Sequence, residues 1–118
     1  EVVATVDPYL AEAQYKRIED VPIDSYDAAL LCIPDEPKIA IIEYLLTHRK
    51  HLLVEKPLFA AKPSDLIKLK DLTEQNHTVC YTAYNLIIVW VVYPIHVLAN
   101  ATSDALYRWC RWFGATDS

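Results

Sequence analysis

Short apolar runs alternate along the first 85 residues with longer segments whose apolar residues recur at helical spacing. The apolar runs are expected to be strands at residues 1–6, 27–33, 52–54 and 78–82. The segments between them are expected to be helices at residues 8–18, 38–48 and 64–76. Strands that alternate with helices in this way predict βαβ units and a parallel sheet, so the expected fold class is α/β.

Two local signals place helix starts within this pattern. Asp7 is followed by Pro8, and Asp suits the N-cap of a helix while Pro suits its first position. Ser64 precedes a segment with Leu66, Leu69 and Leu72 at helical spacing, so Ser64 is the expected cap of the last helix.

Polar residues follow the expected strands. Because parallel strands end at the same edge of a sheet, and ligands bind beyond that edge, these residues are expected to lie together along a binding site. They are Asp7, Pro34-Asp35, Glu55-Lys56-Pro57 and Tyr84-Asn85.

The composition indicates one globular domain and excludes two classes of partner. The chain has 118 residues, 53% of them hydrophobic, and a formal charge of −5, which argues against disorder and against a nucleic-acid partner. The longest apolar run, Leu86–Tyr93, has eight residues and falls short of the roughly 20 that a membrane span needs. We therefore expect neither a nucleic-acid nor a membrane partner.

Cysteine and histidine patterns give no catalytic or metal site. Cys32, Cys80 and Cys110 are odd in number and show no CxxC spacing, which favours free thiols and a cytoplasmic protein over a secreted disulfide framework. The four histidines lack metal-ligand spacing, so no metal is expected. No Ser-His-Asp, phosphate-loop or paired-carboxylate signature is present.

The stretch from Asp27 to Asn85 resembles the family of glucose–fructose oxidoreductase, inositol dehydrogenase and rhizopine-catabolism proteins (Gfo/Idh/MocA). The resemblance rests on the strand that ends in Pro34-Asp35, the Glu-Lys-Pro triplet at 55–57 about twenty residues later, and Tyr84-Asn85. It implies that residues 1–85 are a partial N-terminal domain that binds NAD or NADP. It also implies hydride transfer between the nicotinamide and a hydroxyl-bearing carbon of a sugar or polyol.

The resemblance also suggests roles for individual residues. Lys56 is the implied catalytic residue, which hydrogen-bonds the reacting hydroxyl; the alternative is a surface lysine on a strand-to-helix loop. Pro34, Asp35, Glu55 and Lys56, with Asn85, are the implied cofactor-binding residues near the nicotinamide. Lys38 stands where the family often has His, and no role is carried over to it.

Asp7 has two compatible interpretations. At the end of a second Rossmann strand, its carboxylate would accept hydrogen bonds from the adenosine ribose hydroxyls, and this favours NAD because no Arg follows directly to bind a 2′-phosphate. It would otherwise serve only as the N-cap before Pro8.

The chain departs from the family in its glycines. The G-x-G-x-x-G turn is absent, the one glycine is Gly114, and there is no Met, so we expect that a first strand and its turn are missing upstream. The expected fold is an incomplete Rossmann-like parallel sheet. Its remaining strands must close the gap, accept another chain's edge or pack loosely. A strand at Val21–Ile23 would leave too little chain for a parallel crossover, which needs about a dozen residues.

Residues 86–118 no longer resemble the family. They are expected to form an irregular, apolar, divergent tail or the start of a substrate domain, with a buried strand at Leu86–Tyr93. The leading hypothesis is a fragment of an NAD(P)-dependent oxidoreductase that is inactive alone. The alternative is a non-catalytic βα interaction module, or a degenerate remnant, that forms homo-oligomers through an open sheet edge.

Overall fold

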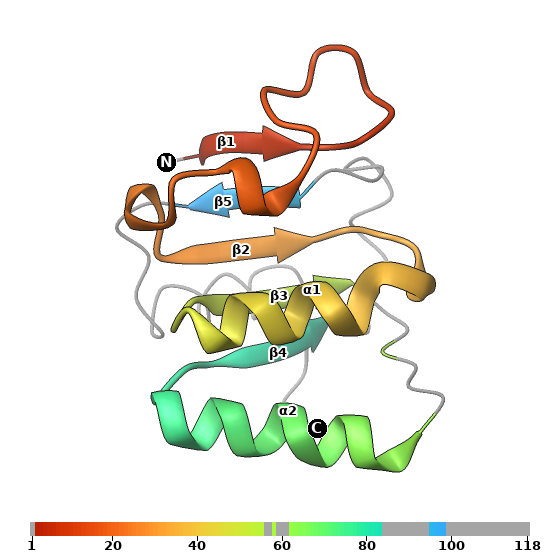
Figure 1. Cartoon of the computed structure of the whole chain (residues 1–118), viewed down its shortest axis with the longest axis vertical. Helices are drawn as coiled ribbons and strands as arrows, with labels where there is room; N and C mark the ends of the chain where they lie inside the picture. The colour runs from red at the N-terminus through yellow and green to blue at the C-terminus, as the bar shows by residue number, and fades with distance from the viewer. Residues whose placement is uncertain (1, 56–57, 59–61, 84–94, 99–118) are drawn as a thin grey trace.

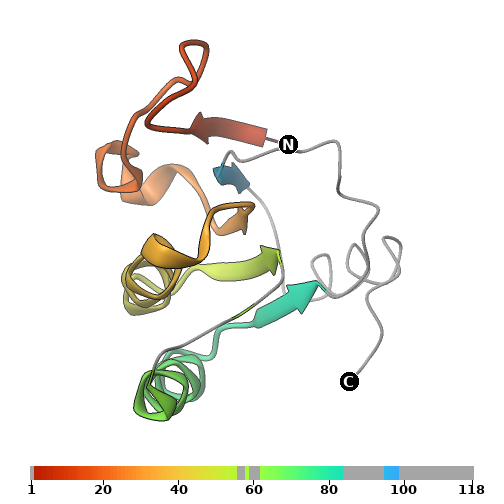
Figure 2. The ribbon, with the colours of Figure 1, turned by 90° about the vertical axis from the view of Figure 1, so that its right-hand side faces the viewer.

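The structure is a computed structural model, and it describes residues 2–55, 58, 62–83 and 95–98. It contains one five-stranded sheet with two α-helices packed on the same face (Figures 1 and 2). The strands are β1 (Val2–Val6), β2 (Ala28–Leu31), β3 (His51–Glu55), β4 (Cys80–Ala83) and β5 (Ile95–Leu98). The helices are α1 (Asp35–Thr47) and α2 (Pro63–Asn76), with 3₁₀ turns η1 (Ile18–Asp20) and η2 (Ile23–Ser25).

The predicted parallel βαβ arrangement is confirmed for β2, β3 and β4. Leu31 pairs with Val54, and Val54 pairs with Thr82, both in parallel register. Helices α1 and α2 provide the two crossovers, as expected for strands that run in the same direction.

The sheet order is β1-β5-β2-β3-β4, so the last described strand lies between the first two (Figure 1). β5 pairs antiparallel with both neighbours, with Ile95 opposite Val6 on one side and Leu31 on the other. β1 and β2 therefore run in the same direction as each other. The gap that the sequence predicted is filled by a later segment of the same chain, an outcome not among the three expected. An antiparallel strand satisfies the backbone groups of both neighbours as a parallel strand would.

The predicted helix at residues 8–18 is wrong. The Asp7 carboxylate instead closes a turn, and its Oδ1 accepts hydrogen bonds from the backbone N–H groups of Tyr9 (2.7 Å) and Leu10 (3.0 Å). The chain then loops back so that Tyr15 forms a parallel bridge with Val6 and exchanges backbone hydrogen bonds with Thr5 and Asp7. Asp side chains favour such turns in competition with helix.

The segment between Asp7 and Asp27 has no strand at Val21–Ile23, in agreement with the short connection in the sequence, and it contains the 3₁₀ turns η1 and η2. Helix α2 starts with Pro63 after an N-cap at Lys62, so Ser64 is not the cap. Pro63 takes the first helical position, where its missing N–H costs nothing.

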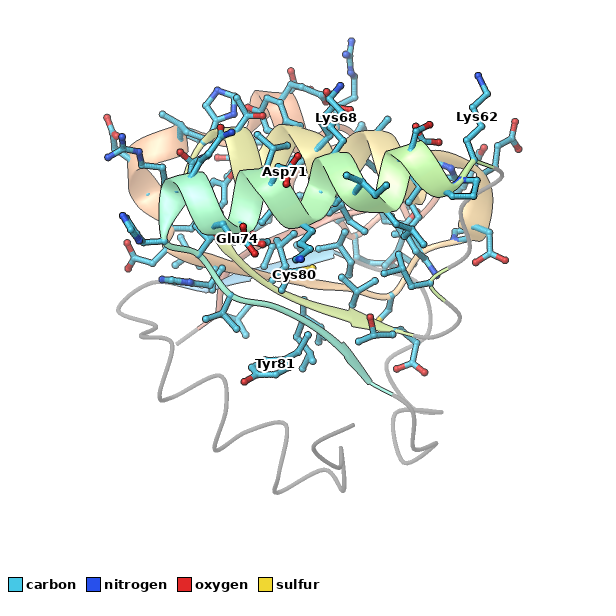
Figure 3. The ribbon with its side chains drawn as sticks, turned by 90° about the horizontal axis from the view of Figure 1, so that it is seen from below. Lys62, Lys68, Asp71, Glu74, Cys80 and Tyr81 are labelled. Carbon is cyan, nitrogen blue, oxygen red and sulfur yellow. The ribbon has the colours of Figure 1, made fainter. Side chains whose placement is uncertain are left out.

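The core lies between the sheet and the helices. Ile42, Leu45 and Leu46 of α1 are fully buried against Leu52 and Val54 of β3. Burial of each such side chain contributes about 1.5–3 kcal/mol. On α2, Leu69 is buried and Leu72 half-buried, as predicted, whereas Leu66 is exposed. On β4, Cys80 points toward α2 and Tyr81 toward the opposite face of the sheet (Figure 3).

Candidate functional site

Strands β1 to β4 all end at one edge of the sheet, which we call the carboxyl edge, while β5 runs the other way (Figure 1). Asp7 directly follows β1, Glu55 is the last residue of β3, and Pro34 and Asp35 join β2 to α1. The structure therefore places these four predicted site residues on the same edge. Lys56 and Asn85 lie outside the described residues.

A cavity of about 670 Å³ opens at this edge between the ends of β1 and β2; we call it the Asp7 cavity. Its walls come from residues 6–9 after β1, residues 16–19 at the start of η1, and residues between 33 and 41 at the start of α1. Ile33, Pro34, Pro37 and Ile41 supply an apolar wall. Such a pocket, mainly apolar with a few polar groups, is typical of a small-molecule site.

Asp7 is buried within this cavity, with only 7% of its surface exposed. Its Oδ1 caps the turn at Tyr9 and Leu10, so the predicted role of Asp7 as a helix N-cap is wrong, because no helix follows it. Its role toward a ribose stays a prediction.

Two basic residues that are nine and ten positions away from Asp7 in the sequence line the same cavity in the folded chain. Lys16 and Arg17 line it, although neither follows Asp7 directly in the sequence. Lys16 Nζ donates to the Leu10 carbonyl, and Arg17 Nε lies 3.5 Å from Glu19 Oε2. Sequence reasoning missed them because it expected a helix here, whereas the loop brings residues 16 and 17 back to the end of β1.

Asp35 and Glu55 are brought together by Lys38. Lys38 is only 1% exposed, and its Nζ lies 3.1 Å from Asp35 Oδ1 and 3.1 Å from the Glu55 carbonyl oxygen. Sequence reasoning assigned Lys38 no role. The available signal was its spacing, because Lys38 lies four residues before Ile42 and seven before Leu45 on the buried face of α1.

The environment of Cys32 excludes a reactive thiolate. Burial, together with the nearby Glu55 carboxylate, raises the pKa of the Cys32 thiol to about 11, although the Lys38 ammonium opposes the shift. Burial likewise raises the pKa of Cys80 to about 12. Both thiols are therefore protonated at neutral pH, and neither is a nucleophile.

A family profile described as an oxidoreductase family with an NAD-binding Rossmann fold, Gfo/Idh/MocA, matches residues 3–84. The chain belongs to this family. The match begins in β1, ends directly after β4 and includes Asp7, Asp35, Lys38 and Glu55. No significant match was found among curated proteins or among solved structures.

Family membership relates the sheet to a Rossmann order. In the order 3-2-1-4-5-6, β1 corresponds to strand two, and β2, β3 and β4 to strands four, five and six. β5 occupies the position of strand one with reversed direction. In an NAD-binding Rossmann domain the glycine-rich turn follows strand one, and here the amino end of β5 lies at that point of the carboxyl edge.

The described residues fit part of a nicotinamide dinucleotide. The Asp7 cavity offers apolar walls for a base and a carboxylate for a ribose. The described residues contain no glycine, so they lack the close backbone approach that holds the pyrophosphate. The Asp7 cavity therefore fits the adenosine half of the cofactor. The part of the carboxyl edge at Asp35 and Glu55, which we call the rim, is where the family resemblance places the nicotinamide half.

The described residues contain neither a metal-binding cluster nor a membrane-spanning helix. They contain no group of three or more His, Cys, Asp or Glu side chains that could hold a metal ion. No helix in the part of the chain that the structure describes has the length and apolar content needed to cross a bilayer.

Proposed function

We propose that the chain binds the adenosine half of a nicotinamide dinucleotide in the Asp7 cavity, as the cofactor-binding portion of an oxidoreductase that acts on a sugar or polyol. The observation that carries the proposal is this cavity, with a buried carboxylate, at the carboxyl edge of the sheet. Residues 1–85 supply the cofactor-binding groups in this proposal. Residues 86–118 are the C-terminal segment in this proposal, and their described part, β5, pairs within the sheet.

Each predicted site residue has a place in the proposal. Asp7 would accept hydrogen bonds from ribose hydroxyls. Pro34, in the wall of the Asp7 cavity, would border the cofactor between its two halves, and Asp35 and Glu55 would border the nicotinamide end. Asn85 would also border the nicotinamide end, and Lys56 would hydrogen-bond the reacting hydroxyl of the substrate. The nicotinamide, when bound, supplies the hydride acceptor or donor.

NAD is the favoured cofactor in this proposal. A buried carboxylate at Asp7 repels a 2′-phosphate, and the guanidinium that lines the same cavity, that of Arg17, lies beside Glu19. NADP is the alternative, because Lys16 and Arg17 line the same cavity.

We propose that the chain alone binds the cofactor weakly and does not turn over substrate. The tightest anchor of a Rossmann domain is its glycine-rich turn, and β5 holds the place of the strand that leads into it. A cytoplasmic location is part of the proposal, since Cys32 and Cys80 are free thiols.

Thermal unfolding with and without ADP-ribose tests this function. Ligand at tenfold its Kd should stabilise the folded chain by about 1.4 kcal/mol and raise Tm by several degrees. Asp7→Asn keeps an acceptor for the turn but removes the charge, and it should weaken binding by about tenfold or more, since hydrogen bonds to charged groups contribute about 1.5–3 kcal/mol.

The matched control is Asp71→Asn, which removes a carboxylate from the exposed surface of α2 (Figure 3). It should leave binding unchanged. An unaltered Tm in a folded protein at millimolar NADH and ADP-ribose would count against the proposed function.

The interaction module remains the second candidate, in which homo-oligomers form through a sheet edge. Among the described strands, β1 and β4 lie at the two ends of the sheet order, and edge strands pair readily with other chains. Light scattering over a concentration series separates the candidates: self-association that ADP-ribose leaves unchanged favours the module.

A further inference from the structure

Lys38 is the one lysine among the described residues that is fully buried. Its ammonium lies between the first turn of α1, through Asp35 Oδ1, and the end of β3, through the Glu55 carbonyl oxygen. The Asp35 side chain is 48% exposed, so the ion pair spans from the core to the surface of the carboxyl edge.

Burial of an ammonium is costly, because the charge leaves water. An apolar side chain of similar length would fill the same space without that cost, so packing alone does not account for Lys38. Unlike an apolar side chain, the ammonium donates a hydrogen bond to the Glu55 carbonyl, and this bond fixes the position of that carbonyl relative to α1. That carbonyl belongs to the peptide group that joins Glu55 to Lys56.

Lys50 provides a comparison at the opposite edge of the sheet. Its Nζ donates to the Tyr26 carbonyl at 2.7 Å and lies 4.8 Å from the centroid of the Tyr26 ring. Both lysines therefore bond a backbone carbonyl beside a strand. Lys50 lies just before β3 begins, whereas Lys38 acts where β3 ends and where the polar site residues gather.

We propose that Lys38 is a positioning residue, which clamps the end of β3 to the first turn of α1 and so sets the rim that receives the nicotinamide half of the cofactor. This inference rests on the proposed function. It does not make Lys38 a catalytic residue, because its ammonium contacts Asp35 and the backbone of Glu55.

The test compares two ligands that differ only in the nicotinamide end of the dinucleotide. NADH and ADP-ribose affinities are measured by titration calorimetry for three proteins: the unaltered chain, Lys38→Met and Lys50→Met. Lys38→Met should weaken NADH about tenfold more than it weakens ADP-ribose. Lys50→Met should change the NADH and ADP-ribose affinities by the same factor, even if it lowers Tm as much as Lys38→Met does.

A second readout is independent of ligand affinity. Loss of the hydrogen bond to the Glu55 carbonyl should shift the ¹⁵N resonance of the following amide, that of Lys56, in Lys38→Met but not in Lys50→Met. If Lys38→Met does not fold, Lys38→Gln, which keeps a donor but no charge, replaces it and should give a smaller shift of the same kind.

The outcomes separate the two proposals. If the unaltered chain binds neither ligand, the proposed function fails and this inference fails with it. If it binds both, and Lys38→Met weakens NADH and ADP-ribose equally or leaves the Lys56 amide unshifted, Lys38 is a structural residue only and the positioning role is overturned.

Discussion

Two residues at the carboxyl edge, Asp7 and Lys38, each connect separate parts of the backbone or side chains there. Asp7 closes a turn and faces a cavity, while Lys38 holds Asp35 and the Glu55 carbonyl in one place. The convergence of Asp35 and Glu55 follows from the sequence, because parallel neighbouring strands end together. The buried Lys38 did not follow, since a lysine at a helix start is ordinarily solvated.

Some residue placements depend on contacts far apart in sequence. Arg17 reaches the Asp7 cavity only because Tyr15 bridges Val6 and the loop turns back. A local pattern of apolar spacing carries no information about that bridge. The sequence therefore predicted a helix at 8–18 in place of the loop and did not place Lys16 and Arg17 at the cavity.

His51 gives a pH-dependent prediction at the residue scale. Its Nδ1 accepts a hydrogen bond from the Val79 N–H at 3.1 Å, and burial lowers the pKa of the ring below 6.5, although Asp27 partly opposes the shift. The unfolded chain then binds more protons than the folded one as pH falls below about 6.5. Stability should be full above that pH and decrease toward the lower pKa of the folded state.

Urea unfolding at several pH values measures this effect. His51→Asn offers an uncharged acceptor to Val79, so its stability should vary less between neutral and mildly acidic pH. An equal pH dependence in the two proteins would show that His51 is not the titrating group.

At the scale of elements, most of the described sheet follows from hydrophobic pattern. β2, β3, β4, α1 and α2 lie within a few residues of their predicted bounds, because both the strand runs and the helical stripes are local signals. β5 could not be predicted, because which segment fills a gap in a sheet depends on long-range pairing. Its four residues, Ile95–Leu98, come from the part of the chain that the sequence predicts to be a divergent tail.

β5 is expected to support the whole sheet, because it pairs with both β1 and β2. Val97 pairs with Ala4 on one side and Ala29 on the other, so Val97→Pro removes a hydrogen bond in the interior of the sheet. The free energy of unfolding in urea should fall by about 3 kcal/mol or more.

Val2→Pro is the matched control, because Val2 is the first residue of β1, at the end of the strand order, and is half-exposed. Proline is tolerated at such a position, and stability should change little. An unchanged urea midpoint for Val97→Pro would mean that β5 does not hold β1 and β2 together in solution.

At the scale of the whole molecule, family membership and sheet architecture both indicate that residues 3–84 correspond to a nucleotide-binding domain. Residues 3–84 match an NAD-binding Rossmann family, and the described sheet keeps strands two, four, five and six of that fold in order. The reversed β5 stands where the pyrophosphate anchor would begin. The molecule is therefore expected to keep an adenosine site and the rim at Asp35 and Glu55, and to lack the anchor for the pyrophosphate between them.

An NMR titration of the ¹⁵N-labelled chain with ADP-ribose is the most direct test of this account. We expect progressive shifts at millimolar ligand for the amides around the Asp7 cavity, which are those of residues 7, 9, 17–19 and 33–36 that carry an N–H. Amides at the opposite edge, such as Lys50 and His77, should stay unchanged. Shifts confined to the opposite edge, or no shifts at all, would contradict a nucleotide site at the carboxyl ends of β1 and β2.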